Sequence, residues 1–306
     1  MKHDFISIAD WSKTGLLDII DVSAKMKEYP ANFSTALKGK HIALIFEKPS
    51  LRTHVTFDVG IAQLGGHSVY LDQQGVNLGR RESVHDAAKN LERWVDAVVI
   101  RTYAHQTCID LSRSMSKPVV NALDDTEHPC QAVGDFHTMG ERLGTFSGKT
   151  LVFMGDGNNV CHSLMLLASK VGMNFIASTP RGYEPAPNVF KMASGFAKES
   201  GGTVDIVHNP KEAIRHADVV YTDVWASMGQ ESEKEKRAEI FKSYQVNAKL
   251  MALARRSPVF MHCLPAHRGE EVTDEVMDST QSIVFNQAEN RLHSQKAILF
   301  TLLKGD

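Results

Sequence analysis

The chain has 306 residues, of which 42% are hydrophobic and 23% are charged, and its formal net charge is −2. This length and composition are ordinary for a globular protein and predict two domains of about 150 residues each. The near-balanced charge excludes a global electrostatic attraction to nucleic acid or to a membrane surface. Any recognition of an anion must therefore come from a local arrangement of residues.

The N-terminus and the cysteines indicate a compartment. Residues 1–5 begin neither a secretory signal nor an arginine-rich transit peptide, and no run approaches about 18 uninterrupted apolar residues. The four cysteines are scattered without C-x-x-C spacing, which fits free thiols rather than a disulfide framework or a zinc site. We therefore expect a cytoplasmic protein that binds neither a membrane nor a metal.

Short apolar runs alternate with amphipathic helical patterns in chain order, which predicts βαβ units and mostly parallel sheets. The predicted strands are residues 42–46, 68–71, 97–100 and 119–121, and then residues 150–154, 174–177, 204–207, 219–222, 259–261 and 282–285. Helical patterns lie between them, the clearest at residues 53–64, 84–94 and 164–172. The charged segment 231–239 alternates in sign at helical spacing, which predicts a solvated helix face. The expected fold class is α/β, with two doubly wound domains whose mostly parallel central sheets are flanked by helices.

Two helical patterns suggest how the domains are joined. Residues 130–143 form a pattern that stops at Gly144 and lacks the Pro, Gly and Ser content of a flexible linker, so it predicts an interdomain helix. Residues 288–306 contain the last helical pattern, which we expect to pack back on the first domain. The first expected domain therefore comprises residues 1–143 together with this last helix, and the second comprises residues 144–287.

The string Ser50-Leu51-Arg52-Thr53 follows the first predicted strand and opens a helical pattern. Loops at the carboxyl ends of strands are where open α/β sheets bind ligands. Hydroxyls, backbone N–H groups and a guanidinium at a helix N-terminus suit a phosphate through dipole, amides and charge together. The alternative is an ordinary capped helix, because Lys-Pro-Ser before an apolar period is a common helix start. The string therefore predicts an anion site without establishing one alone.

Two further candidates lie in loops where a ligand crevice is expected. Arg101 follows a buried predicted strand, where its side chain points either toward a ligand or into solvent as a surface cation. His128 and Gln131 lie one helical turn apart at the start of the interdomain helix and share one face. The alternative for His128 is an ordinary loop histidine.

Later strands are followed by candidates for an amino-acid ligand. Asp223 leaves the strand at 219–222 and suits an ammonium ion, although aspartate in such a place is more commonly a turn former. The string His262-Cys263-Leu264-Pro265 also follows a strand. Its cysteine is either a nucleophile or, more commonly, a buried small hydrophobe.

The turn Gly155-Asp156-Gly157-Asn158-Asn159-Val160 follows a strand and opens a helix, which is the setting of a dinucleotide-binding fingerprint. Valine occupies the third glycine position, and the next strand leads into Ser178-Thr179-Pro180 without an acidic residue to hold a ribose. Nicotinamide binding is therefore disfavoured. The same turn can instead present Asn159 to the amino or carboxylate group of a small ligand.

Taken together, these strings resemble the aspartate/ornithine carbamoyltransferase family, and its ornithine-specific branch in particular. The resemblance runs in the family's order from Phe46-Glu47-Lys48-Pro49 to Gln287-Ala288-Glu289-Asn290-Arg291, which is nearly the whole chain. It implies transfer of the carbamoyl group of carbamoyl phosphate to the δ-amine of L-ornithine, giving L-citrulline and phosphate in arginine metabolism. It also implies an enzyme without metal or organic cofactor, and a homo-oligomer that is a trimer or a multiple of one.

The resemblance also assigns roles to single residues. The residues implied to bind carbamoyl phosphate are Ser50, Leu51, Arg52, Thr53, Asn77, Arg101, His128, Gln131, Cys263, Leu264 and Arg291. The residues implied to bind ornithine are Asn159, Asp223, Ser227 and Met228. The residues implied to be catalytic are Arg52, Arg101, His128 and Cys263. The arginines would meet the phosphate charge, and His128 would help to polarise the carbonyl oxygen.

Two positions depart from the family's pattern. The first string usually reads Ser-Thr-Arg-Thr, and Leu51 keeps the backbone N–H of this position but not the hydroxyl. Asn77 stands where the family tends to have glutamine, so a ligand contact made by that side chain in a neighbouring subunit would have a shorter reach.

Three alternatives stay open at the level of sequence. A sister carbamoyltransferase that uses putrescine or another amine would differ at Asp223, Asn159 and the loop 227–229. A nicotinamide oxidoreductase would bind its cofactor at the glycine turn. A non-catalytic regulator on the same fold would have lost Arg52, Arg101 or His128, all of which are present.

Overall fold

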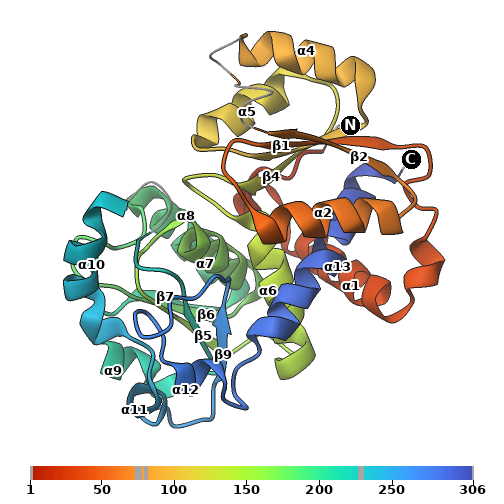
Figure 1. The fold of residues 1–306 in the computed structure, drawn as a ribbon. Helices are drawn as coiled ribbons and strands as arrows, with labels where there is room; N and C mark the ends of the chain where they lie inside the picture. Colours follow the sequence, from red (N-terminus) through yellow and green to blue (C-terminus); the bar gives the residue numbers. More distant parts are fainter. Residues whose placement is uncertain (1–2, 73–77, 79–81, 227–230, 305–306) are drawn as a thin grey trace. The chain divides into compact units, whose positions relative to one another are not determined.

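The computed structural model describes residues 3–72, 78, 82–226 and 231–304 of the chain (Figure 1). The chain divides into two compact units, the first comprising residues 1–138 and 289–306 and the second residues 139–288. Two helices, α6 (Pro129–Leu143) and α13 (Val284–Leu303), run across this division. None of the helices among the described residues has the length and apolar character needed to span a bilayer.

The first unit is built on a four-stranded parallel sheet in the order β2-β1-β3-β4. Its strands are β1 (His41–Phe46), β2 (His67–Asp72), β3 (Ala97–Arg101) and β4 (Val119–Leu123), and its other helices are α1 (Lys13–Glu28), α2 (Leu51–Gln63), α4 (Val84–Trp94) and α5 (His105–Ser114). Helices α4 and α5 pack on one face of the sheet through Ala88, Leu91 and Leu111, and α2 and the end of α13 lie on the other (Figure 1). The sheet is therefore covered on both faces, as its wholly buried strand β3 requires.

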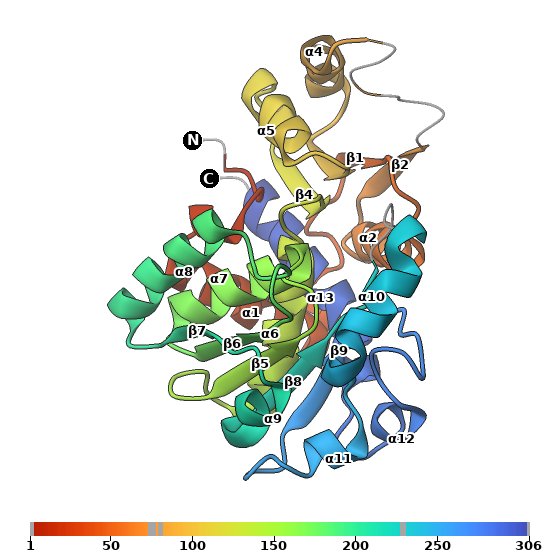
Figure 2. The same ribbon diagram turned by 90° about the vertical axis from the view of Figure 1, so that its left-hand side faces the viewer.

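The second unit contains a five-stranded parallel sheet in the order β7-β6-β5-β8-β9. Its strands are β5 (Thr150–Met154), β6 (Asn174–Ser178), β7 (Val204–Ile206), β8 (Val219–Thr222) and β9 (Val259–His262). Its helices are α7 (Asn159–Val171), α8 (Pro187–Ser200), α9 (Pro210–Ala213), α10 (Lys234–Phe241), α11 (Ala248–Met251) and α12 (Asp274–Met277). Helices α7 and α8 cover one face, and α9, α11 and α12 pack on the other (Figure 2).

Each sheet changes its winding direction at one pair of adjacent strands. In the first unit these are β1 and β3, whose last residues Phe46 and Arg101 are register partners. In the second unit they are β5 and β8, where Met154 pairs with Thr222. The loops that leave such a pair at the carboxyl edge diverge to opposite faces of the sheet and form a crevice between them. The Ser50–Thr53 string and Arg101 in the first unit, and the glycine turn and Asp223 in the second, therefore lie at the two places where this fold binds ligands.

The predicted α/β class with two parallel sheets is confirmed, and one predicted strand is wrong. Residues 282–285 form no strand, because Ser282 makes only an isolated bridge to Phe260 and α13 begins at Val284. The backbone N–H of Ile283 still donates to Phe260 O at 3.0 Å, and Gln287 N already donates to Ile283 O at 2.9 Å. The apolar run is thus the first turn of a long helix, a distinction that periodicity cannot make over four residues.

Candidate active site

The anion-site string opens helix α2 as the sequence predicts. Ser50 is the N-cap residue, and its Oγ accepts a hydrogen bond from the backbone N–H of Thr53 at 3.2 Å. The helix begins at Leu51, so Leu51, Arg52 and Thr53 occupy its first turn, where backbone N–H groups have no partner within the helix. The Leu51 side chain is apolar and 74% exposed, so the backbone N–H is the only group of this residue that can donate to an anion. The first turn therefore offers amides, a helix dipole and the half-buried Arg52 side chain to an anion.

Arg291 brings the C-terminal helix to this string. Its Nη2 donates to Thr53 Oγ1 at 2.7 Å, and both side chains are buried. The pair joins positions 238 residues apart in the sequence. Thr53 therefore positions a second guanidinium at the first turn of α2.

Basic side chains gather around the end of strand β3. Arg101, His128, Lys48 and Arg291 are all buried. Burial lowers the pKa of His128 well below its ordinary value of 6.5, and the positive charges of Arg291 and then Arg101 lower this pKa further. Burial also lowers the pKa of Lys48, followed by the charge of Arg101. His128 is therefore neutral near pH 7, while the two guanidiniums keep their charge, and this part of the unit is suited to a doubly negative group.

Lys48 is a site candidate that the sequence analysis did not single out. Its Nζ lies 4.5 Å from the centroid of the Tyr103 ring, a cation–π geometry. Its signal in the sequence was only its place after strand β1, two residues before Ser50.

The loop before α6 fixes His128. Asp124 Oδ1 accepts from the backbone N–H groups of Thr126 and Glu127, both at 2.8 Å. Glu127 in turn accepts from Ser7 Oγ and from the backbone N–H of Ile8. Further along, Gln131 N donates to His128 O at 3.1 Å, and its side-chain Nε2 donates to Asp135 Oδ1 at 2.8 Å. The one-turn spacing of His128 and Gln131 is thus observed.

We expect the neutral His128 to produce a pH dependence of stability. Its pKa is lower in the folded state than in the unfolded chain, so the unfolded chain takes up a proton at this residue first as the pH falls. Its contribution to stability is therefore full above about pH 6.5 and is lost as the pH falls below that value. The loss should reach about 1.4 kcal/mol per pH unit relative to a His128→Gln variant. Chemical denaturation between about pH 7 and pH 5 measures both slopes, and equal slopes would contradict a buried neutral His128.

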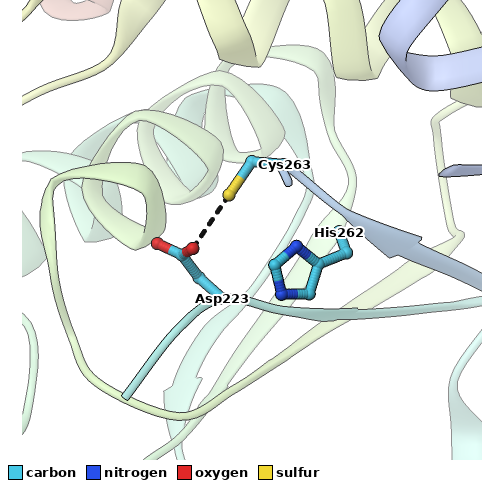
Figure 3. A group of neighbouring side chains, drawn as sticks. All are labelled: Asp223, His262 and Cys263. Atoms are coloured by element: carbon cyan, nitrogen blue, oxygen red, sulfur yellow. Dashed lines mark hydrogen bonds between the residues drawn. The ribbon is translucent and has the colours of Figure 1, made fainter. Parts of the chain in front are cut away.

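The second unit places a thiol against a carboxylate at the ends of β8 and β9 (Figure 3). Cys263 Sγ donates to Asp223 Oδ1 at 2.9 Å, and the backbone N–H of Val224 donates to the same oxygen at 2.8 Å. Asn158 Nδ2 donates to Asp223 Oδ2 at 2.8 Å. Three donors thus converge on the Asp223 side chain, and a thiol that gives its hydrogen to a carboxylate is not prepared as a thiolate nucleophile. This arrangement favours a binding role for Asp223 and Cys263.

Asn158 is a second residue that the sequence analysis missed. It is the N-cap of α7, with its Oδ1 accepting from Val160 N and Cys161 N, while its Nδ2 reaches Asp223. Asn159, the predicted ligand residue, is the first residue of the helix, and its Oδ1 accepts from Val160 N at 3.0 Å. Two consecutive asparagines after a turn were the signal, but which of them faces the carboxylate depends on the helix start.

Arg237 is an exception to the solvated helix face predicted for residues 231–239, of which residues 232–236 and 239 are exposed. Its side chain is buried, and its Nη1 donates to Asp156 Oδ2 at 2.7 Å and to Trp225 O at 3.1 Å. Its Nε donates to Glu233 Oε2 at 2.8 Å. The arginine thus ties the loop after β5 to the loop after β8. Alternation of charge at helical spacing cannot show that one member of the pattern is paired in the interior.

The backbone of residues 184 and 185 packs closely against Gly157 in the glycine turn. A Cβ at this position would lie 2.3 Å from the backbone nitrogen of Pro185 and 2.4 Å from the carbonyl carbon of Glu184. The close approach that a dinucleotide fingerprint reserves for a pyrophosphate is taken here by the chain's own backbone. The structure therefore argues against nicotinamide binding at this turn.

The same contact predicts a stability effect. Gly157→Ala is expected to lower the free energy of unfolding by about 1 to 3 kcal/mol, because backbone atoms must move to admit the methyl group. Gly195, inside α8, has open space around its Cβ position, so Gly195→Ala should raise stability by about 0.5 to 1 kcal/mol. Denaturant titration of both variants checks the pair, and equal effects would contradict the assigned contact.

Two clusters in the described part of the chain have metal-ligand atoms within 4.8 Å of one another. The first is Asp223, His262 and Cys263, and the second is His267, Glu270 and Glu271. In the first, both ring nitrogens of His262 are already engaged, with Leu264 N and with Glu271 Oε1. In the second, Glu270 is paired with Lys234 at 2.9 Å. Metal binding at either cluster would have to break these contacts.

Three candidate residues lie outside the described residues, namely Asn77, Ser227 and Met228. The described candidates form two groups, one in each unit. Ser50, Leu51, Arg52, Thr53, Arg101, His128, Gln131 and Arg291 belong to the first unit, and Asn159, Asp223, Cys263 and Leu264 belong to the second.

The fold and these groups define a two-unit α/β protein with buried basic side chains at the switch point of one sheet and a hydrogen-bonded aspartate at that of the other. Comparison with known families matches both units. Residues 3–141 match the aspartate/ornithine carbamoyltransferase carbamoyl-P binding domain, and residues 147–302 match the Asp/Orn binding domain of the same family. The chain belongs to the aspartate/ornithine carbamoyltransferase family, which is a family of transferases.

Individual relatives agree with this placement over almost their whole length. The chain is 48% identical over 305 residues to the ornithine carbamoyltransferase of Pyrococcus horikoshii, covering 99% of this chain and 96% of that protein. It is 49% identical over 306 residues to that of Methanothermobacter thermautotrophicus, covering both chains completely. The solved ornithine carbamoyltransferase of Pyrococcus furiosus matches with a TM-score of 0.96 at 47% identity, over 99% of this chain and 97% of that one.

Proposed function

We propose that the protein transfers the carbamoyl group of carbamoyl phosphate to the δ-amine of L-ornithine, giving L-citrulline and phosphate in arginine metabolism. The observation that carries the proposal is the buried basic cluster around Arg101, of which Lys48, Arg101 and His128 fall within the residues that match a carbamoyl-P binding domain. The identity of 48–49% with proteins named ornithine carbamoyltransferase supports it. We assign the carbamoyl phosphate domain to residues 1–143 with helix 288–306, and the ornithine domain to residues 144–287.

In this proposal the phosphate is bound at the first turn of α2. The backbone N–H groups of residues 51–53, the Ser50 and Thr53 hydroxyls and the Arg52 guanidinium supply donors of the kind that phosphate oxygens accept. Arg101 and Arg291 add positive charge. Because both side chains are buried, solvent screens their attraction to the phosphate only weakly. Both arginines therefore stabilise the negative charge that grows on the leaving phosphate.

The carbonyl oxygen of the carbamoyl group is polarised by Arg101 and His128. A neutral imidazole still carries one N–H, so His128 donates a hydrogen bond without adding another cation beside two arginines. Gln131 orients the carbamoyl NH₂. One such donor aimed at a developing oxyanion contributes about 3 kcal/mol to the lowering of the barrier.

Ornithine is bound through its amino-acid end. Asp223 takes the α-ammonium group and Asn159 the carboxylate, with Cys263 beside the side chain, while Cys263 and Leu264 also bind carbamoyl phosphate. The neutral δ-amine attacks the carbamoyl carbon, the new C–N bond forms, and the C–O bond to phosphate breaks with its electron pair going to phosphate. The nitrogen then loses one proton, which the departing phosphate takes up, so the products are citrulline and inorganic phosphate.

The family resemblance adds Asn77 to the carbamoyl phosphate residues, and Ser227 and Met228 to the ornithine residues. These three assignments rest on the sequence, since the residues lie outside the described part of the structure. The cytoplasmic location expected from the sequence stays a prediction.

The test is the stoichiometry of products. With ¹³C-carbamoyl phosphate and L-ornithine, we expect labelled citrulline and phosphate to form in equal amounts at a rate well above the uncatalysed one. Phosphate release without citrulline would indicate a hydrolase. No turnover with any amine would favour a non-catalytic regulator on this fold.

We further propose that the protein is a homotrimer or a multiple of one. An apolar stripe on α2 supports an interface, because Leu51, Val55 and Val59 recur at four-residue spacing and are 74%, 47% and 39% exposed. Light scattering should give three times the chain mass or a multiple of it. Val55→Lys should reduce this mass, whereas Met192→Lys, at an exposed position on α8, should leave it unchanged. A monomeric wild-type protein would contradict the proposal.

A further inference from the structure

We infer that Glu271 is a positioning residue for the carbamoyl transfer. Through the imidazole of His262 it holds the backbone amide of Leu264, and with it the loop that carries Cys263. The inference rests on the proposed function, because that function gives the Cys263-Leu264 loop its role beside the substrates. Nothing in the sequence singles out Glu271, which lies in a charged run after the motif.

The carboxylate of Glu271 is fully buried beneath this loop. Its Oε1 accepts from His262 Nε2 at 3.1 Å and from the backbone N–H of His267 at 2.5 Å. His262, the last residue of β9, is itself 1% exposed. Burying a carboxylate is costly unless it is hydrogen-bonded, and the partners of Oε1 are the two ends of the segment 262–267, while Oε2 has no hydrogen-bond partner among the described residues.

The hydrogen bond at His262 Nδ1 determines which ring nitrogen of His262 carries the hydrogen. The backbone N–H of Leu264 donates to His262 Nδ1 at 2.8 Å, so Nδ1 carries a lone pair and the ring hydrogen is on Nε2. Glu271 is the acceptor of that hydrogen. The opposite tautomer would turn an N–H toward the Leu264 N–H and a lone pair toward a carboxylate, and both contacts would be repulsive. Glu271 therefore selects the tautomer that holds Leu264.

Leu264 needs this support because of its backbone. Its φ is +59°, and it is the one non-glycine residue with a positive φ among those the structure describes. A residue with a side chain is unfavourable at such a positive φ and persists there only where neighbouring contacts hold it. One residue earlier, the Cys263 thiol is fixed by its 2.9 Å hydrogen bond to Asp223. The strained residue thus lies between a thiol held by Asp223 and an imidazole held by Glu271.

The backbone of His262 is anchored independently. Its N–H donates to Gln287 Oε1 at 3.0 Å, and Gln287 Nε2 donates to the Tyr221 hydroxyl at 3.1 Å. The start of the loop therefore stays in place when Glu271 is changed. What is lost is the orientation of the His262 ring and of the residues after it, and a displacement of about 1 Å in a site costs about 100-fold in rate.

The experiment compares Glu271→Ala and Glu271→Gln with Glu270→Ala as the matched control. Glu270 is the neighbouring residue with the same side chain, and its carboxylate pairs with Lys234 rather than with His262. We measure kcat and KM for ornithine, and separately the rate at which iodoacetamide alkylates Cys263. The other three cysteines are buried, so the reagent reports on this loop, and a Cys263→Ala variant confirms the site of alkylation.

We expect Glu271→Ala to lower kcat about 10- to 100-fold and to raise the alkylation rate several-fold. Glu271→Gln should recover most of both values, because its amide oxygen accepts from His262 Nε2. Glu270→Ala should match the wild type. In the wild type, ¹⁵N chemical shifts of the His262 ring should show the hydrogen on Nε2, a readout that needs no variant.

Three results would overturn the inference. They are an Nδ1–H tautomer of His262, a folded Glu271→Ala variant with wild-type kcat and Cys263 reactivity, and effects of Glu270→Ala as large as those of Glu271→Ala. If the wild type forms no citrulline, the proposed function fails, while the alkylation rates and the tautomer still decide whether Glu271 holds the loop.

Discussion

Arg52→Ala is expected to lower kcat/KM for carbamoyl phosphate about 100- to 1000-fold with little change in thermal stability. Arg52 lies in the first turn of α2, half-buried, and pairs with no carboxylate among the described residues. Within the described part of the chain, its loss therefore removes no ion pair. It does remove a guanidinium that would meet phosphate oxygens as their charge increases in the transition state. Steady-state kinetics with carbamoyl phosphate varied at saturating ornithine measure the effect.

Two variants make the Arg52 result specific. Arg52→Lys keeps the charge without the planar fork and should recover only part of the activity. Arg93→Ala removes an exposed arginine of the same unit from helix α4 and should stay within about threefold of the wild type. Near-normal kinetics in folded Arg52→Ala would refute the phosphate assignment.

Asp223→Asn is expected to lower kcat/KM for ornithine about 100-fold or more, while the affinity for carbamoyl phosphate stays close to that of the wild type. The change preserves the size of the side chain and removes the charge that would pair with the α-ammonium group. It also leaves the donors Asn158 Nδ2 and Cys263 Sγ facing an uncharged amide. Ornithine saturation curves and equilibrium dialysis of labelled carbamoyl phosphate separate the two effects.

The control for this prediction is Asp205→Asn, which makes the same chemical change at an exposed position on strand β7. It should leave both substrates unaffected. An unchanged ornithine KM in Asp223→Asn would show that Asp223 is a structural carboxylate and that the amino-acid end binds elsewhere.

The architecture was accessible from the sequence because it follows from local patterns. Apolar runs of strand length, separated by helical periods, predicted the two parallel sheets, and each chemically distinctive string lies at the end of one of their strands or in the loop after it. The prediction of a strand at residues 282–285 was wrong, because the first turn of α13 has the same apolar pattern as a short strand. Local patterns therefore place candidate residues at the carboxyl edge of a sheet. They do not predict which side chains form hydrogen bonds with those residues.

The partners were not accessible because they come from distant or irregular parts of the chain. Arg291 reaches Thr53 across 238 residues, and Arg237 reaches Asp156 across 81. Glu271 is only nine residues from His262, but its role depends on which ring nitrogen faces which neighbour. Such hydrogen bonds arise from tertiary packing, and no spacing rule specifies them.

The most direct test of the central claim compares acceptors for the carbamoyl group. Product formation from carbamoyl phosphate would be measured with L-ornithine, putrescine, N-acetylornithine and L-aspartate at matched concentrations. The proposed function predicts a strong preference for ornithine, with citrulline as the product. A preference for another amine would contradict it and overturn the assignment of Asp223, although the phosphate-binding residues would keep their role.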